Sequence, residues 1–307
     1  MDYLLLVVAL GLIIGGAMLL TDGSVALARR LRIPEFIVGL TVVAVGTSMP
    51  EMAVSMISTI GGHGDMAIGN VVGSNIANVL FILGVCAIFA PVAFTKSNIR
   101  RDLPLNIVVS LVLLLVTFTS ASIGRIEGIL LLMGYVAMII YSVRSDRKAM
   151  SREEVSKEDI SMLRVLLMIV AGLAGLIFGG DMFVDSATNI ALSWGVSEAV
   201  IAITLVAVGT SLPELAASLA SIIKGSAAIA LGNVVGSNIA NILLILGACS
   251  TVTPLTMKGV AMSDIYVVVA TSFILLLSAL FIGDKKITRF EGLVFVAIYA
   301  TYIYMLL

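Results

Sequence analysis

The ten residues 69–78, GNVVGSNIAN, occur a second time without change at residues 232–241. Gly69 thus corresponds to Gly232, and this defines a fixed displacement along the chain. A shorter match keeps the same displacement, because GTSMPE at residues 46–51 corresponds to GTSLPE at residues 209–214. Nearly identical runs at one fixed spacing are the signature of an internal repeat. The chain is therefore two copies of one unit.

The sequence around these motifs is too apolar for a soluble protein. Hydrophobic residues make up 60% of the 307-residue chain and charged residues 12%, whereas soluble domains carry about a quarter charged residues. A helix needs about 20 apolar residues to cross a bilayer, and several stretches reach that length. The expected fold class is therefore all-α integral membrane. Apolar spans are predicted near residues 3–28, 36–60, 66–91, 103–122 and 125–143, and near 162–188, 198–223, 228–252, 263–282 and 288–306.

The number of spans in each copy determines how the two copies are oriented. Each copy has five predicted spans, and an odd number of crossings makes the second copy enter the membrane from the opposite face. The sequence thus predicts ten transmembrane helices as two inverted five-helix repeats. The predicted segments are a first repeat at 1–143, a linker at 144–161 and a second repeat at 162–307.

Lysine and arginine residues predict the orientation in the membrane, because short cytoplasmic loops hold most of them. With the N-terminus outside, sixteen of the eighteen fall in inside loops, and only Arg125 and Lys258 fall outside. We therefore expect a multi-pass protein of the cell (cytoplasmic) membrane whose two termini are extracytoplasmic. The linker at 144–161 is then a solvated tether in the cytoplasm.

Charge and cysteine content argue against several other classes. The net charge is −1 and the basic residues form no continuous face, so nucleic acid is not an expected partner. Cys86 and Cys249 occupy equivalent positions inside apolar stretches, which is typical of small buried side chains. We expect no cofactor, no enzymatic activity and no obligatory protein partner, with the lipid bilayer as the surroundings.

Two acidic residues stand deep inside predicted spans. Glu51 and Glu214 end the two copies of the GTSxPE motif, with long apolar sequence on either side. An ionised carboxylate at that depth is costly unless a partner compensates it, and neither span has Lys or Arg close to its glutamate. A bound cation, or a proton, is the available compensation. The two glutamates are therefore candidate functional residues.

The proline before each glutamate predicts a broken helix. Pro50 and Pro213 have no amide hydrogen, so the carbonyl four residues earlier loses its helical hydrogen bond. Proline also disfavours helical geometry in the residue before it. Residues 44–48 and 207–211 are predicted to be kinked or partly unwound, and exposed carbonyls at membrane depth are typical of transporter ion sites.

Further oxygen atoms are predicted to face the glutamates. A step of four residues keeps side chains on one helix face, so the span after each glutamate carries a polar stripe. Such stripes are also typical of close helix packing in lipid, but packing does not need the acids. Carboxylates, carbonyls, hydroxyls and amides can supply the roughly six to eight oxygen ligands of Ca²⁺. The stripes are Asn70, Ser74 and Asn78, and Asn233, Ser237 and Asn241.

Four other acidic residues are predicted to stabilise helices and not to bind ions. Glu127 and Glu291 open their spans, which favours a role in the first helical turn. Asp22 and Asp185 correspond to each other at the displacement of the repeat, and capping of a helix segment is preferred over a place beside an ion path.

At these residues the chain resembles the Ca²⁺/cation antiporter superfamily, whose two alpha-repeats carry G-T-S-x-P-E and G-N-x-x-G-S-N-x-x-N/D motifs. The motifs lie in an alpha-1 region at 39–84 and an alpha-2 region at 202–247, and the compact chain looks most like the prokaryotic Na⁺/Ca²⁺ exchangers. The resemblance implies that Glu51 and Glu214 are shared Ca²⁺/Na⁺ ligands. It further implies Ca²⁺ ligation by the carbonyls of Thr47 and Thr210, with flanking Na⁺ subsites formed by Ser48, Ser211, Ser74, Ser237, Asn78, Asn241 and the carbonyls of Ala44 and Ala207.

One position departs from some relatives. K⁺-dependent exchangers carry Asp in the second repeat where this chain has Asn241. A third titratable carboxylate is therefore missing, which argues against K⁺ co-transport.

The sequence predicts an alternating-access antiporter in which the spans at 3–28 and 162–188 move against a core that holds the site. Sodium entering down its gradient would drive calcium out. One alternative replaces Na⁺ by H⁺, because a buried carboxyl group can carry a proton instead of a metal ion, giving an H⁺/Ca²⁺ or other divalent cation exchanger. An intramembrane hydrolase is a weaker alternative, because the sequence contains neither a water-activating metal motif nor a nucleophile with its base. A passive channel is also less favoured, because broken helices in inverted repeats suit an occluded site better than a continuous pore.

Overall fold

The computed structural model describes residues 1–119, 122–150, 160–194, 207–256, 260–282 and 285–306. Within these residues eight helices are long and apolar enough to cross a membrane, and the bent pair Glu35–Thr47 and Met49–Ile60 makes a ninth. The described part is all-α apart from four strands of two residues each. The chain is thus an all-α membrane protein.

The elements of the first half include π-helical turns, labelled η, inside several spans. These wider turns interrupt the regular hydrogen-bond pattern of an α-helix and often occur at functional sites. The elements are α1 (Asp2–Leu31), α2 (Glu35–Val38), η1 (Gly39–Val43), α3 (Ala44–Thr47), α4 (Met49–Ile60), α5 (Gly64–Ala77), η2 (Asn78–Ile82), α6 (Leu83–Phe89), β1 (Val92–Ala93), η3 (Asn98–Asp102), α7 (Leu103–Thr119), β2 (Ser122–Ile123) and α8 (Arg125–Met150).

Part of this order recurs in the second half. From α4 to β1, each element has a counterpart whose first and last residues follow at the displacement of the sequence repeat. The predicted span at 198–223 is described from residue 207 onward, and its earlier residues lie outside the described part. The elements are α9 (Met162–Ser193), α11 (Ala207–Thr210), α12 (Leu212–Ile223), α13 (Ala227–Ala240), η5 (Asn241–Ile245), α14 (Leu246–Val252), β3 (Leu255–Thr256), α15 (Met262–Leu277), η6 (Ser278–Ile282), β4 (Lys286–Ile287) and α16 (Arg289–Leu306).

The predicted tether at 144–161 begins as a helix. Helix α8 continues through residues 144–150, beyond the apolar span predicted at 125–143. The stretch contains no Gly or Pro and includes the good helix formers Arg, Lys, Ala and Met, so nothing ends the helix where the apolar span stops. Residues 151–159 lie outside the described part.

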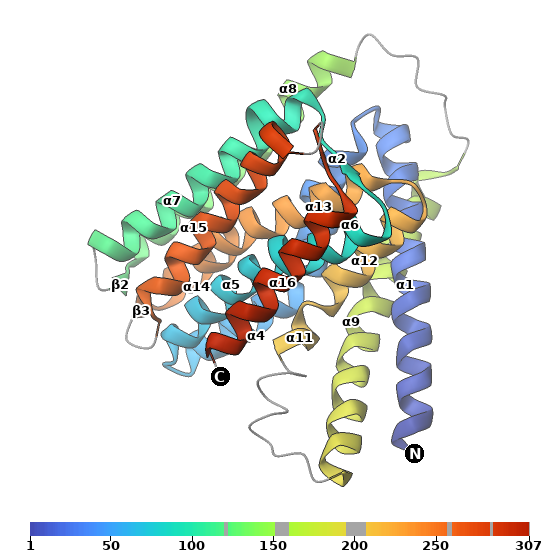
Figure 1. Ribbon diagram of the computed structural model, residues 1–307, viewed down its shortest axis with the longest axis horizontal. Coiled ribbons are helices and arrows are strands. Elements are labelled where there is room, and N and C mark those ends of the chain that lie inside the picture. The colour runs from blue at the N-terminus through green and yellow to red at the C-terminus, as the bar shows by residue number, and fades with distance from the viewer. Residues whose placement is uncertain (120–121, 151–159, 195–206, 257–259, 283–284, 307) are drawn as a thin grey trace.

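Helices α5 and α13, with their continuations α6 and α14, form the buried centre of the molecule, and α1 and α9 lie side by side at one edge (Figure 1). The α1–α9 pair is held by small residues. A Cβ atom on Gly16 would lie 2.8 Å from the carbonyl oxygen of Gly172, and one on Gly172 would lie 2.6 Å from the amide nitrogen of Leu20. Backbones this close give the dense packing that joins helices in lipid.

Two short antiparallel ladders connect the halves. Strand β1 pairs with β4, placing Val92 opposite Ile287, and strand β2 pairs with β3, placing Ser122 opposite Thr256. Each half contributes one strand to each ladder. The two halves are therefore interlocked around the central helices.

Candidate ion-binding site

A break in the helix precedes each glutamate, as the prolines predict. Ser48 separates α3 from α4 with φ −82° and ψ 10°, and the chain bends by 46° there. Ser211 separates α11 from α12 with φ −88° and ψ 1°. Among the described residues, no hydrogen bond reaches the carbonyl oxygens of Thr47 and Thr210. Both breaks therefore leave carbonyl oxygens available to a cation.

Glu51 and Glu214 lie in the first turns of α4 and α12, and both side chains are 1% exposed. The hydroxyl of Ser48 donates to Oε1 of Glu214 at 3.0 Å, so a group from the first half contacts the glutamate of the second. The two carboxylates are close enough to interact electrostatically. The acids thus meet in one site, away from lipid.

One oxygen of each carboxylate is left unsatisfied. Oε2 of Glu51 and Oε2 of Glu214 are buried and have no hydrogen-bond partner among the described residues. Neither glutamate forms an ion pair within that part of the chain. Because a buried charged oxygen without a partner is costly, this arrangement calls for a cation.

The polar stripes support the backbone beside each acid. Asn70 Nδ2 donates to the carbonyl oxygen of Glu51 at 3.3 Å and to Ser55 Oγ at 3.0 Å. In the second half, Asn233 Nδ2 makes the equivalent bonds to the carbonyl of Glu214 at 3.3 Å and to Ser218 Oγ at 2.9 Å. In the described contacts these two asparagines therefore position the glutamates.

The side chains of Asn78 and Asn241 each have one amide oxygen without a hydrogen-bond partner among the described residues. Asn78 Nδ2 donates to Asn238 Oδ1 at 3.0 Å, and Asn241 Nδ2 donates to Asn75 Oδ1 at 3.0 Å. Oδ1 of Asn78 and of Asn241 is buried without a partner among the described residues. Both residues begin π-helical turns, η2 and η5. Their free oxygens are further candidate cation ligands.

Asn75 and Asn238 are residues that the stripe analysis missed. Each donates Nδ2 to the backbone carbonyl of the other, at 3.2 and 3.3 Å, across the contact between α5 and α13. They lie one residue after the serines of the stripes and so face the opposite half. Their place in both copies of the GNVVGSNIAN motif was the available signal.

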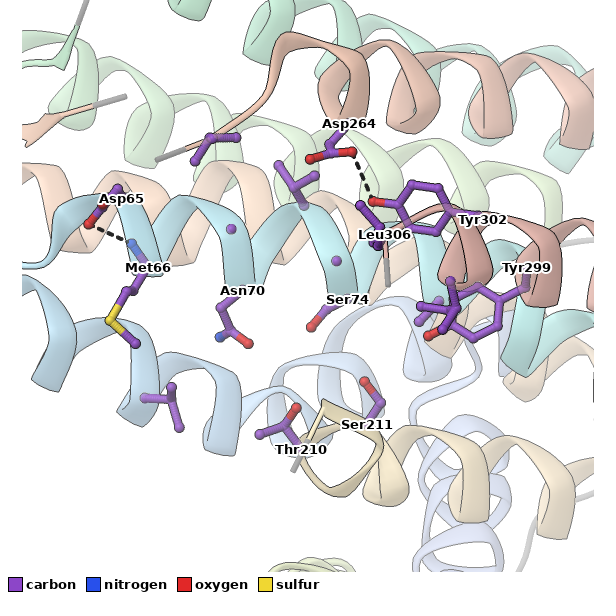
Figure 2. A pocket seen from close by; sticks show the side chains of 17 residues that line it. Asp65, Met66, Asn70, Ser74, Thr210, Ser211, Asp264, Tyr299, Tyr302 and Leu306 are labelled. Carbon is purple, nitrogen blue, oxygen red and sulfur yellow. Dashed lines mark hydrogen bonds between the residues drawn. The ribbon is translucent and has the colours of Figure 1, made fainter. Parts of the chain in front are cut away.

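Ser74, Ser211 and Thr210 border a cavity of about 640 Å³ against α5 (Figure 2). Ser74 on α5 points toward Ser211 between α11 and α12, and both side chains are more than nine-tenths buried. Ser237, the counterpart of Ser74, accepts a hydrogen bond from Ser48 Oγ at 3.1 Å. Residues from both halves thus converge here.

The carbonyls of Ala44 and Ala207 are the predicted Na⁺ ligands before the two breaks. The carbonyl of Ala44 already accepts hydrogen bonds from the Ser48 amide at 3.0 Å and from Thr47 Oγ1 at 3.4 Å. Ala207 is the first residue of α11.

The structural role predicted for Glu291 is confirmed. Its Oε2 accepts from the amide of Thr288 at 2.8 Å and from Thr288 Oγ1 at 2.7 Å, which caps the start of α16. The capping predicted for Asp22 and Asp185 is wrong, because both lie well inside the continuous helices α1 and α9. Packing of these two helices overrides the local cap signal. The carboxylate of Asp22 instead pairs with Lys224.

The site as a whole offers oxygen atoms. Within the described ranges, no group of three or more His, Cys, Asp or Glu side chains comes together around a possible metal position. Two carboxylates, amide oxygens and carbonyls suit hard cations such as Ca²⁺ and Na⁺ better than transition metals.

Comparison with known proteins agrees with this chemistry. A family described as "Sodium/calcium exchanger protein" matches residues 1–144 and 164–307. The chain belongs to this exchanger family. Exchangers are transporters, so family membership indicates cation/Ca²⁺ antiport and confirms the predicted antiporter superfamily.

Similar exchangers and membrane proteins cover nearly the full chain. The sodium/calcium exchanger MaX1 of Methanosarcina acetivorans is 31% identical over 347 residues, covering 99% of this chain and 98% of that protein. The inner membrane protein YrbG of Escherichia coli (strain K12) is 36% identical over 286 residues, covering 90% and 86%. The sodium-calcium exchanger NCX_Mj, in a structure soaked with Na⁺ and Sr²⁺, matches with a TM-score of 0.87 and 31% identity over 99% of this chain and 97% of that one.

Proposed function

We propose that this exchanger family member is a secondary active antiporter that exchanges Na⁺ for Ca²⁺ by alternating access at a site built on Glu51 and Glu214. The observation that carries the proposal is the pair of buried acids, one from each half, whose Oε2 atoms have no partner among the described residues. Two negative charges compensate one Ca²⁺, and the same oxygens can hold Na⁺ when Ca²⁺ leaves. Competition for shared ligands is the physical basis of exchange.

The proposed ligands follow the oxygens around the two breaks. Ca²⁺ is bound by the carboxylates of Glu51 and Glu214 and by the carbonyls of Thr47 and Thr210, which accept no hydrogen bond in the described part. The unsatisfied Oδ1 atoms of the two stripe asparagines support the neighbouring Na⁺ subsites. These subsites comprise Ser48, Ser211, Ser74, Ser237, Asn78, Asn241 and the carbonyls of Ala44 and Ala207.

The proposed topology places this site at the bilayer midplane. Glu214 lies in the first turn of α12 and Lys224 follows its last turn, a rise of about 15 Å in a helix, which is half of the roughly 30 Å hydrocarbon layer. We propose ten transmembrane helices as two inverted repeats, 1–143 and 162–307, with segment 144–161 cytoplasmic and both termini extracytoplasmic. The common displacement of elements from α4 to β1 supports the repeat. Helices α1 and α9 are then the pair that moves against the core.

The rival counter-ion is H⁺. Glu51 and Glu214 lack a basic partner in the described part of the chain, and such a carboxyl group can be neutralised by a proton as well as by Na⁺. The same site would then serve an H⁺/Ca²⁺ exchanger.

Counterflow experiments separate the two counter-ions. Proteoliposomes loaded with Na⁺ and diluted into Na⁺-free buffer containing radioactive Ca²⁺ are expected to accumulate Ca²⁺, because outward Na⁺ movement drives inward Ca²⁺ movement. An outward proton gradient of equal size, without Na⁺, is expected to drive little uptake. Uptake driven by the proton gradient alone would select the H⁺ alternative. If neither gradient drove Ca²⁺ uptake, antiport would be contradicted.

A further inference from the structure

A line of buried hydroxyl groups leads from Glu214 toward the end of α12, along its contact with α1. Ser218 lies one turn after Glu214 and accepts the hydrogen bond from Asn233. Ser221 follows, and its Oγ lies 3.1 Å from Oγ1 of Thr21 on α1. Ser218, Ser221 and Thr21 are each at most 1% exposed. The seam between α1 and α12 is therefore polar inside an otherwise apolar protein.

The line continues on α1, and a cavity lies near the end of α12. Ser24 lies one turn after Thr21 on the same helix face; it is 0% exposed, and its Oγ has no partner among the described residues. A cavity of about 410 Å³ lies between α1, α9 and the end of α12, and its lining includes Asp22, Arg29 and Lys224 but not Ser24. This is the face predicted to be cytoplasmic. The hydroxyl line thus extends from Glu214 toward the end of α12, where Asp22 and Lys224 border a polar cavity at one face.

An ion pair closes the outer end of this seam. Lys224 Nζ donates to the carboxylate of Asp22 and, at 3.2 Å, to the carbonyl oxygen of Met18. Both partners on α1 therefore contact one ammonium group fixed to the end of α12. The acid that faces the cavity is occupied by a cation of the protein itself.

The repeat equivalent of the Asp22–Lys224 pair keeps the aspartate but has no lysine. At the displacement of the repeat, Asp22 corresponds to Asp185, whereas Lys224 corresponds to Gly61. In the described part, Asp185 forms no ion pair. The fold can therefore hold the equivalent acid without a lysine, and the ammonium group is a feature of one face only.

We propose that the α1–α12 seam is the route by which substrate cations travel between the Glu51/Glu214 site and the face where α12 ends, and that Lys224 closes this route by occupying Asp22. The inference rests on the proposed exchange function. When α1 moves relative to α12, Asp22 separates from Lys224 and becomes available to Ca²⁺ or Na⁺. The hydroxyls of Ser24, Thr21 and Ser221 then replace water around the passing ion. Lys224 competes with the substrate for one carboxylate, so it sets the apparent affinity at this face.

Transport measured separately at the two faces tests the role of Lys224. In proteoliposomes of known orientation, Lys224→Gln is expected to lower the KM for Ca²⁺ at the α12 end by about two- to fivefold, the range that an exposed ion pair supports. The KM at the opposite face stays unchanged. Exchanging the pair, Asp22→Lys with Lys224→Asp, restores the wild-type values, and Lys286→Gln, which removes a charge outside the seam, has no effect. Equal KM values for wild type and Lys224→Gln at both faces would overturn the role of Lys224.

Thiol labelling tests the route without relying on transport. In a background with Cys86→Ala and Cys249→Ala, Ser24→Cys is expected to react with a cationic, membrane-impermeant methanethiosulfonate from the α12 end, and several-fold faster when Lys224→Gln is added. Gly15→Cys, on a part of α1 where a Cβ meets nothing described within 4 Å, is the unreactive control. Active exchange with an unreactive Ser24→Cys would overturn the route alone. A reactive Ser24→Cys in a protein without Na⁺-driven or H⁺-driven exchange would contradict the proposed function and leave the route standing.

Discussion

Glu51→Gln and Glu214→Gln are each expected to reduce Na⁺-driven Ca²⁺ uptake at least about a hundredfold. Glutamine keeps the size of the side chain and one oxygen, but it removes one of the two charges that compensate Ca²⁺. Leaving a buried charge without its partner costs about 3–5 kcal/mol, and every 1.4 kcal/mol is about a factor of ten in binding. Because both acids are 1% exposed, solvent cannot replace the lost charge. The measurement is the initial rate of radioactive Ca²⁺ uptake into Na⁺-loaded proteoliposomes.

The matched control for these variants is Glu127→Gln. Glu127 lies in the first turn of α8, outside the candidate site, so the same change should leave the uptake rate close to that of wild type. Size-exclusion profiles of all three variants should match the wild type, which separates loss of binding from loss of folding. Near-normal uptake by either site variant would rule out the two-glutamate site.

Gly16→Ala is expected to destabilise the protein, whereas Gly15→Ala should be tolerated. A Cβ atom on Gly16 would lie 2.8 Å from the carbonyl oxygen of Gly172 and 2.9 Å from the amide nitrogen of Leu176, and neither backbone group can move aside alone. A Cβ on Gly15 meets nothing within 4 Å in the described part of the chain. Overpacking of this kind costs about 1–3 kcal/mol, while alanine in an open helical position gains up to about 1 kcal/mol over glycine.

Thermal unfolding in detergent and exchange activity measure this difference. The Gly16→Ala protein should unfold several degrees below wild type and exchange more slowly, because α1 can no longer pack closely on α9. The Gly15→Ala protein, changed at the neighbouring residue of the same helix, should unfold at or slightly above the wild-type temperature and exchange at the wild-type rate. Equal stability of the two variants would show that the α1–α9 contact is looser than described.

Sequence reasoning identified the candidate site through its rarest residues. A carboxylate inside an apolar stretch has few explanations, so Glu51 and Glu214 were identifiable from sequence alone, and the prolines located the breaks at Ser48 and Ser211. Spacing of four residues identified Asn78 and Asn241 as candidate ligands, because a straight helix keeps them on the same face as the serines, and the Oδ1 atom of each has no partner in the described part. These features depend on local geometry, which sequence determines directly.

Contacts between distant segments were harder to predict. Asn75 and Asn238 bond each other from different halves of the chain, and nothing in either local pattern shows which helix they face. Asp22 was predicted to cap a helix segment, but packing of α1 on α9 keeps α1 continuous past this residue. The carboxylate of Asp22 forms an ion pair with Lys224 instead. Helix α8 extends past the predicted apolar span because charged residues end an apolar span without ending a helix.

The two β ladders have a consequence for how the chain acquires its fold. Ser122 pairs with Thr256 and Val92 pairs with Ile287, so each ladder joins residues from opposite halves of the chain. Contacts between residues this far apart form slowly, because closing a long loop costs entropy before the contact stabilises it. During synthesis, the first half enters the membrane without the strands and asparagines that complete its core. We therefore expect the halves to fold and unfold as one cooperative unit, completed only after the last helices have been inserted.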